Sequence, residues 1–341
     1  MCEEKILSKF HLSDFFHYTT TSENEWTSDD KIDAIFIPTS GRASYVSRLL
    51  SEIKNMEIPI YLLPTTPSDY NASSLPENLV VLWWSSDTQF IDALKLLKTP
   101  KNKICLAFSQ KSDLAAKRNY ALWYSKIHGF SKILFLDDDI RGITTSMIQL
   151  GASCLRNFVL CGPFIDDFPD LSIIEHIAND LRENVSLLFI SGGALFVRIN
   201  TDNIGFFPPL YNEDWLFILP HLTAKKITVL GSIYQESYDP FADSSKAMFQ
   251  EVGELIINGL FSLVQSNAYA FRHNQEIWEQ TIISRKNWLL RLLNKSRIKQ
   301  HKLCIIKALE AYENLEAIHC SQFIYDWERD LEFWNNLYRR L

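Results

Sequence analysis

Three features are missing from this sequence: an excess of basic residues, a CxxC cysteine pair and a long apolar run. The formal net charge is −7, so no overall basic field favours nucleic acid as a partner. The six cysteines are scattered, which predicts neither a zinc site nor a disulfide framework. Because no run of roughly 18 apolar residues occurs, we predict no membrane-spanning segment.

The beginning of the chain also lacks the features of a secretory signal. Residues Met1–Lys5 are acidic overall and no apolar stretch follows them. We therefore expect a cytoplasmic protein in a reducing environment, where cysteines stay as thiols.

The order of strand-like and helix-like segments predicts an α/β fold. Residues 1–30 form an N-terminal extension without assigned chemistry, 31–245 alternate between the two patterns, and 246–341 are helical. This alternation predicts a mostly parallel central sheet flanked by helices, followed by a helical C-terminal extension. The expected strands are Ile32–Pro38, Ile58–Leu63, Leu79–Trp84, Lys103–Phe108, Ile133–Leu136, Ala194–Ile199 and Ile227–Gly231. The expected helices are Ser44–Asn55, Asp87–Leu97, Asp113–His128 and Trp215–Ala224, and Gly253 and Gly259 are expected to interrupt the first C-terminal helix.

The most informative stretch is the apolar run Ile133–Leu136 followed by Asp137, Asp138 and Asp139. Ligands bind outside the carboxyl ends of strands in open α/β sheets, so the three carboxylates are placed where a site is expected. Three adjacent like charges need solvent or a cation, and Mg²⁺ is commonly shared between carboxylates and substrate phosphates. The alternative is a solvated acidic turn.

Further polar and glycine-containing segments accompany the acidic triplet. Gly192 and Gly193 follow an apolar run, and they either let the backbone approach a ligand or form a bulge. Glu213 and Asp214 begin a helical pattern, where Asp214 could serve simply as a helix cap. These segments occur in the order Ser40-Gly41-Arg42, Lys117-Arg118-Asn119, Asp137-Asp138-Asp139, Gly192-Gly193 and Asn212-Glu213-Asp214.

This order resembles nucleotide-sugar glycosyltransferases of the GT-A fold, especially the inverting family 2, over roughly residues 31 to 240. The resemblance implies a hexosyltransferase whose acidic triplet is a DxD motif and whose downstream Glu-Asp pair bears the catalytic base. It implies Mn²⁺ or Mg²⁺ as the cofactor and a nucleotide-sugar donor. An acceptor hydroxyl would attack the sugar with inversion.

The resemblance also assigns roles to individual residues. Asp214 is the expected general base and Glu213 orients it or binds the acceptor. Asp139 is the expected metal ligand, with Asp137 contacting the ribose or sharing the metal. The expected donor-binding residues are Ser40, Arg42, Lys117, Arg118, Asp137, Asp138, Gly192 and Gly193. Lys117 has the alternative of a solvated helix face.

Two departures from the family pattern leave rival functions open. The acidic residue after the second strand is matched poorly by Asp69, and no histidine occupies the position of the third metal ligand. Gln235 or Glu236 could take that place, whereas His221 is expected on a helix face. The rivals are a nucleotidyltransferase that makes an activated sugar and a non-catalytic binding or scaffold protein. The short turn Thr39–Arg42 is too poor in glycine for the first rival.

The helical C-terminal part carries a basic amphipathic pattern. Residues 285–307 hold eight Lys or Arg and no Asp or Glu, interleaved with Trp288, Leu289, Leu292 and Leu293. This pattern suits an anionic membrane surface or an acidic partner, and it allows a lipid-linked or anionic acceptor. The alternative is a packed helix with a solvated basic face. Residues 323–341 either pack on the domain or form a homodimer contact.

Overall fold

The computed structural model describes residues 17–18, 30–66, 76–109, 112–166, 168, 170–183 and 190–341. Its sheet has the strand order β1-β9-β7-β8-β5-β2-β3-β4, and β6 pairs with β9. The strands are β1 (His17–Tyr18), β2 (Ala34–Thr39), β3 (Ile60–Pro64), β4 (Leu79–Val81), β5 (Lys132–Leu136), β6 (Ile140–Arg141), β7 (Leu160–Asp166), β8 (Ala194–Arg198) and β9 (Ile227–Gln235). Only β8 and β6 run antiparallel to described neighbours, so the predicted mostly parallel sheet is confirmed.

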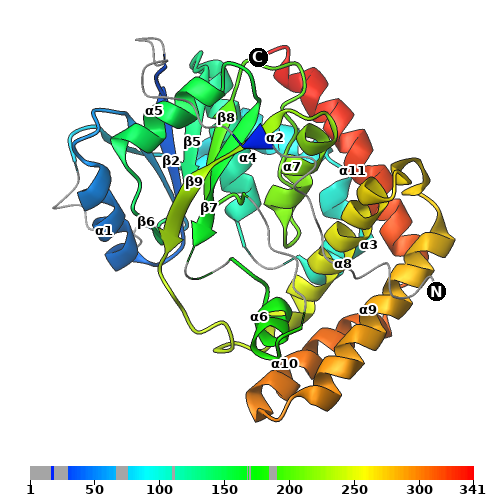
Figure 1. Cartoon of the computed structure of the whole chain (residues 1–341). Helices are drawn as coiled ribbons and strands as arrows, with labels where there is room; N and C mark the ends of the chain where they lie inside the picture. Colours follow the sequence, from blue (N-terminus) through cyan, green and yellow to red (C-terminus); the bar gives the residue numbers. More distant parts are fainter. Residues whose placement is uncertain are drawn as a thin grey trace.

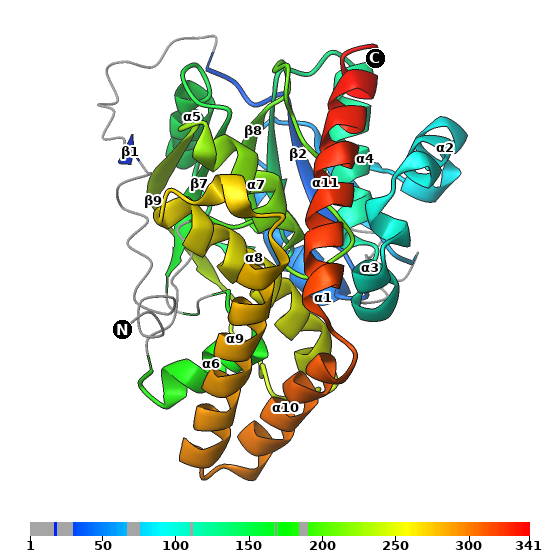
Figure 2. The same ribbon diagram turned by 90° about the vertical axis from the view of Figure 1, so that its right-hand side faces the viewer.

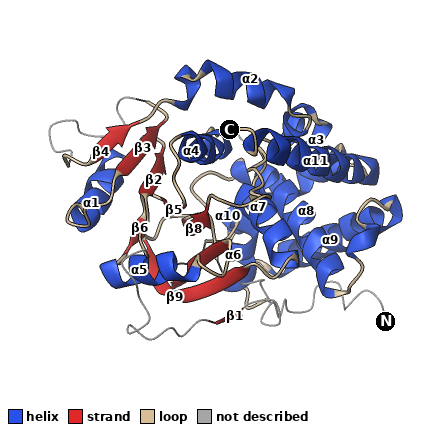
Figure 3. Ribbon diagram, turned by 90° about the horizontal axis from the view of Figure 1, so that it is seen from above, coloured by secondary structure: helices blue, strands red, loops and turns tan. Residues whose placement is uncertain are grey.

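Helices cover both faces of this sheet, as the view from above shows (Figure 3). The helices are α1 (Ala43–Ile53), α2 (Thr88–Leu96), α3 (Lys103–Phe108), α4 (Leu114–Ile127), α5 (Thr145–Cys154), α6 (Ile173–Asp180), α7 (Glu213–Thr223), α8 (Lys246–Gln265), α9 (Gln275–Lys295), α10 (Lys299–Glu310) and α11 (Ala317–Tyr338). Helices α1 and α5 lie on one face, and the C-terminal helices gather on the other (Figures 1 and 3). The predicted α/β fold with a helical C-terminal region is therefore confirmed.

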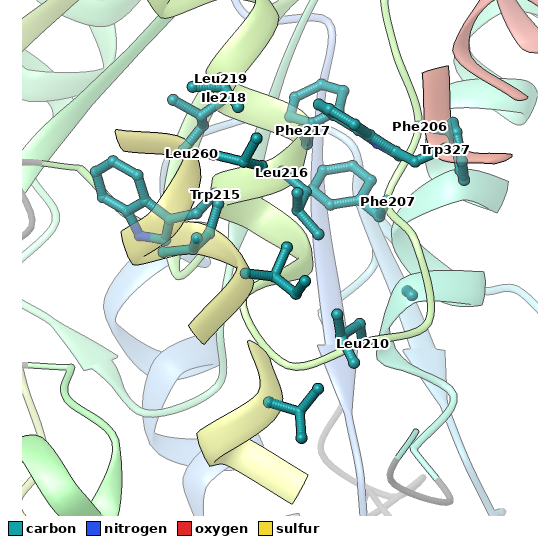
Figure 4. Close-up of a cluster of buried hydrophobic side chains, with 14 of the residues drawn as sticks. Phe206, Phe207, Leu210, Trp215, Leu216, Phe217, Ile218, Leu219, Leu260 and Trp327 are labelled. Carbon is teal, nitrogen blue, oxygen red and sulfur yellow. The ribbon is translucent and has the colours of Figure 1, made fainter. Parts of the chain in front are cut away.

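Side chains alternate between two cores because successive residues of a strand point to opposite faces. In β5, Phe135 joins the larger core under the C-terminal helices, while Leu134 and Leu136 join the smaller core under α1 and α5. Figure 4 shows part of the larger core, where Phe207 stacks on Phe217 of α7 with ring centroids 4.1 Å apart. The helix that begins with Glu213 and Asp214 is thus anchored by its own apolar residues.

The expected strand Lys103–Phe108 is wrong, because this segment is helix α3. Asn102 caps the helix by accepting a hydrogen bond from the Ile104 amide at 2.9 Å. Ile104, Cys105 and Phe108 are buried while Leu106 is 72% exposed, which is a helical and not an alternating pattern. Short apolar runs do not distinguish the two structures by periodicity alone.

The expected interruption at Gly253 and Gly259 is also wrong, because α8 is continuous. A Cβ atom at Gly253 would lie 2.2 Å from the Tyr211 carbonyl oxygen, and one at Gly259 would lie 2.6 Å from the Trp278 ring. Both glycines therefore permit close packing. Helix α8 is long and apolar enough to cross a membrane, but 72% of that stretch is buried inside the protein, as in a core helix.

The last helix, α11, packs back on the domain, which is the first of the two predicted alternatives for residues 323–341. Its residues Phe323, Trp327 and Trp334 are buried. The Asp330 carboxylate accepts hydrogen bonds from the Lys98 and Thr99 amides at 2.7 and 2.6 Å. The five described cysteines are all buried, and none forms a disulfide.

Candidate active site

A cavity of about 500 Å³ lies at the carboxyl ends of β5 and β9 and the start of α7. Of the residues predicted for the site, it is lined by Arg42, Arg118, Asp137, Asp139, Gly193, Glu213, Asp214 and Gln235. The structure therefore brings together side chains from five separate segments of the chain. Seven acidic and three basic side chains line this cavity, so acidic groups predominate in its lining.

Arg42 holds two of the three triplet carboxylates at the end of β2. Its guanidinium donates to Asp139 Oδ2 at 2.8 Å and forms an ion pair with Asp138. Asp138 is fully buried and also accepts from the Thr39 hydroxyl at 2.6 Å. Burial raises the pKa of Asp138 to about 6, although Arg42 opposes this. Asp138 thus fixes the turn after β5 and does not reach the cavity.

Arg118 of α4 connects the acidic triplet to the Glu-Asp pair. It donates to both oxygens of Asp137 at 3.0 Å and to Glu213 Oε1 at 2.7 Å. Only 3% of Arg118 is exposed, so these bonds are shielded from water. Burial raises the pKa of Glu213, with Arg118 acting against this change and Asp214 adding to it.

Asp214 is held by the backbone at the beginning of α7. Its Oδ2 accepts from the Gly192 amide at 2.7 Å, and its Oδ1 accepts from its neighbour, the Trp215 amide, at 2.8 Å. Asn212, the residue before α7, has a left-handed conformation with φ of 66°, which turns the chain into the helix. The carboxylate is therefore fixed at one orientation on the cavity wall, and it retains lone pairs for a substrate proton.

Lys117 and Ser40 are placed differently from the residues that line the cavity. Lys117 is 1% exposed and donates to the Thr39 carbonyl oxygen and the Thr65 hydroxyl, both at 2.6 Å. It also pairs with Asp113 at 2.8 Å. Lys117 therefore stabilises the end of β2 and does not line the cavity. Ser40 is exposed in the turn beside it. Asp69 lies outside the described residues.

Gln235 supports the predicted cation site. It ends β9 at the cavity, and its buried Oε1 has no hydrogen-bond partner among the described residues. Asp137 and Asp139 line the same cavity, so the three residues offer oxygen ligands of the type that Mg²⁺ and Mn²⁺ favour. Within the described ranges no group of three His, Cys, Asp or Glu could hold a metal alone. The fit therefore requires oxygens from a ligand as well.

Gly192 makes room for Arg118. A Cβ atom at position 192 would lie 2.4 Å from Arg118 Nη1, so alanine would displace the guanidinium from Asp137 and Glu213. We expect Gly192→Ala to lower the free energy of unfolding by about 1–3 kcal/mol. Gly231→Ala is the matched control, because a Cβ there meets no atom within 4 Å. Urea unfolding of both variants is the measurement, and equal stabilities would contradict this account.

The sequence reasoning missed Asp170 in the cavity but singled out the segment of Tyr238. Asp170 lines the cavity, where the surrounding walls and the charges of Asp214, Asp137 and Asp139 raise its pKa. Tyr238 packs edge-on to Phe168 with ring centroids 4.9 Å apart, which provides an aromatic wall. The density of aromatic and polar residues in 238–241 suits a wall for a sugar acceptor, and an ordinary packed loop is the alternative.

A buried ionic cluster behind the cavity was also missed. Arg285 of α9 donates to Glu251 Oε1 at 2.9 Å and to Glu175 Oε1 at 3.1 Å. The adjacent Glu254 accepts from Asn212 Nδ2 at 3.3 Å. Arg285 is only 4% exposed, so this member of the predicted basic stretch is structural. The cluster links the C-terminal helices to the residue that precedes Glu213.

Glu254 makes stability depend on pH. Burial and the nearby Glu175 raise its pKa to about 7, well above the value in an unfolded chain. The folded state therefore binds more protons, and stability falls as pH rises from about 4.5 to about 7. We expect the free energy of unfolding of Glu254→Gln to decrease less over this pH range than that of wild type, by up to about 3 kcal/mol. Urea unfolding at pH 5, 6, 7 and 8 is the measurement, and parallel pH profiles for wild type and variant would exclude the effect.

No family model and no curated protein sequence matches the chain. Solved structures of nucleotide-sugar transferases are similar to it. The mannosyltransferase PcManGT from Pyrobaculum calidifontis, in complex with GDP-Man and Mn²⁺, has a TM-score of 0.42 and 10% identity, with 90% of each chain covered. Glucosyl-3-phosphoglycerate synthase of M. tuberculosis has a TM-score of 0.43 and 12% identity, covering 73% of this chain and 86% of its own.

A nucleotide-diphospho-sugar transferase of Desulfovibrio desulfuricans G20, described as putative, has a TM-score of 0.33 and 10% identity. It covers 73% of this chain and 97% of its own.

Proposed function

We propose that this protein transfers a sugar from a nucleoside diphosphate sugar to an acceptor hydroxyl, with a divalent cation and with inversion. The observation that carries the proposal is the bridge made by Arg118. Arg118 donates both to Asp137, the first residue after β5, and to Glu213, which is next to Asp214 in the sequence. All four of these residues line one cavity. The donor-binding carboxylates and a candidate base therefore face the same space.

The proton transfer is assigned to Asp214. Removing the acceptor proton as the new bond forms requires a carboxylate held at a fixed orientation. The Gly192 and Trp215 amides supply that orientation, and Glu213, which accepts from Arg118, would bind the acceptor. Attack from the side opposite the leaving group would invert the anomeric carbon.

Asp139, Asp137 and Gln235 would hold the cation. When bound, a divalent cation neutralises the charge that develops on the leaving diphosphate. Arg42 and Arg118 now pair with Asp139 and Asp137, and each guanidinium can instead turn a donor toward a phosphate oxygen. The excess of carboxylates in the cavity is the physical reason for expecting metal dependence.

The test is calorimetric titration of nucleoside diphosphates and nucleotide sugars, each with Mn²⁺, Mg²⁺ or chelator. We expect one base to bind only with a cation, and Asp139→Asn to remove this binding. Asp202→Asn is the control, because Asp202 is exposed and lies outside the cavity lining. Absence of binding by every member of the panel would overturn the proposal.

Product analysis separates the proposal from its rivals. Release of a nucleoside diphosphate indicates sugar transfer, whereas pyrophosphate indicates nucleotidyl transfer. Metal-independent nucleotide binding without turnover would favour a binding or scaffold protein. The Arg42–Asp139 ion pair keeps this second candidate open, since it offsets part of the charge of the triplet without a metal.

A further inference from the structure

Helices α9 and α10 form an antiparallel hairpin that projects from the body of the protein (Figures 1 and 2). Basic and apolar side chains are exposed together around its tip. We call the following residues the hairpin surface: Lys286, Leu290, Arg291, Arg297, Ile298, Lys299, Lys302, Leu303 and Ile306. Of its apolar members, Leu290 is 42% exposed, Ile298 54%, Leu303 41% and Ile306 46%.

The structure divides the basic stretch of 285–307 into two groups. Arg285 is buried, Lys295 pairs with Glu183 at 2.6 Å, and Lys307 pairs with Glu310 at 2.8 Å. The other five basic residues are those of the hairpin surface, and no ion pair is described for them. The opposite sides of both helices are packed into the protein through Trp288, Leu289, Leu292, Cys304 and Ile305.

We propose that the hairpin surface docks on an anionic phospholipid membrane. Residues 285–307 contain no Asp or Glu, so every charged residue of the hairpin surface is basic. Basic residues near an anionic bilayer each add about 1 kcal/mol of attraction, and exposed aliphatic side chains add favourable burial at the interface. A nucleic acid would gain nothing from four exposed aliphatic side chains, and the chain as a whole carries a net charge of −7.

Docking in this way places the cavity beside the membrane. The Gln300 side chain donates to the Phe241 carbonyl oxygen at 2.7 Å, and His301 packs on the Phe241 ring with centroids 4.6 Å apart. Phe241 belongs to the loop from Tyr238 to Asp243, which forms one wall of the cavity. A membrane-borne acceptor would then reach the cavity directly. This consequence rests on the proposed function, whereas membrane docking itself does not.

The test is flotation of the full chain with phosphatidylcholine vesicles that contain or lack phosphatidylglycerol, in chelator and without nucleotide. The variant is Ile298→Ser with Lys299→Glu. Ile298 is the N-cap residue of α10 and Lys299 lies in its first turn, where serine and glutamate respectively favour helix formation. The variant should therefore fold, and thermal unfolding checks that it does.

The matched control is Leu106→Ser with Lys31→Glu, which removes an exposed leucine and an exposed lysine elsewhere on the protein. We expect wild type and control to float with anionic vesicles, and the hairpin variant to bind at least about tenfold more weakly. High salt should weaken wild-type binding.

Three results would overturn membrane docking. These are no flotation of wild type with anionic vesicles, equal binding to neutral vesicles, and equal binding by the hairpin variant. Binding to soluble polyglutamate in place of vesicles would instead identify an acidic macromolecule as the partner. The flotation assay contains no sugar donor and no acceptor. Its outcome therefore does not depend on whether the proposed function is correct.

Discussion

Asp214→Asn should lower the rate of sugar transfer by about 10²–10⁴-fold while nucleotide-sugar binding stays close to wild type. The amide keeps the size of the carboxylate but cannot accept the proton of the attacking hydroxyl. The donor contacts assigned to Arg42, Arg118 and Asp139 do not involve Asp214 directly. The two quantities to measure are the turnover rate and the calorimetric dissociation constant of the donor.

The variant has one structural cost that must be measured. The asparagine side chain would offer a single oxygen to the Gly192 and Trp215 amides, which now bind separate oxygens of Asp214. One buried amide without an acceptor costs about 1–3 kcal/mol, so urea unfolding should accompany the kinetics. Full activity of Asp214→Asn would remove Asp214 from the role of base. Glu213→Gln is the comparison, and a larger loss in that variant would transfer the role to Glu213.

The elements that carry the site could be predicted from sequence because each has a strong local pattern. The strand at Ile133–Leu136 and the helix that begins near Asp87 were both predicted. The Asp87 side chain caps α2 by accepting a hydrogen bond from the Phe90 amide at 2.9 Å. The helical structure of Lys103–Phe108 was not predicted, because six residues are too few to show a period. Its assignment as helix depends on the Asn102 cap and on tertiary packing.

Side-chain partners across the site could not be predicted in the same way. The resemblance predicted that Arg118 binds the donor, but its bond to Glu213 joins residues 95 positions apart. Asp170 follows no motif, and it reaches the cavity only because β7 runs parallel beside β9. Glu254 lies in the apolar helix α8, and the sequence alone did not indicate that it contacts Asn212. Long-range ion pairs depend on how the strands are ordered, which a single sequence does not specify.

Arg118→Met should cause the largest loss of stability of any single substitution in the cavity. Methionine fills much of the arginine volume but leaves Asp137 and Glu213 without their shared partner. Removing one member of a buried ion pair costs about 3–5 kcal/mol, mainly because a charge is left uncompensated. Urea unfolding of Arg118→Met beside Arg48→Met measures this cost, since Arg48 is an exposed arginine that pairs with Glu236 outside the cavity lining.

A double variant tests whether the uncompensated charge is the cause. Arg118→Met with Glu213→Gln removes the arginine and one of its two carboxylates, so the double variant should recover part of the stability lost by Arg118→Met alone. If the double variant is no more stable, lost packing against Phe207, whose ring centroid lies 5.7 Å from the guanidinium carbon, explains the loss instead.

Arg118→Met should also change ligand binding in two opposite directions. Without the guanidinium the cavity becomes more negative, so Mn²⁺ alone should bind more tightly, because Asp137 is freed from its ion pair. A nucleoside diphosphate with the cation should bind more weakly, because a charge-assisted donor for phosphate is lost. Calorimetry with the metal alone and with the metal and diphosphate together resolves the two effects. An equal decrease in both affinities would indicate that the site has collapsed, and would contradict the view that Arg118 and the cation share the charge of one cavity.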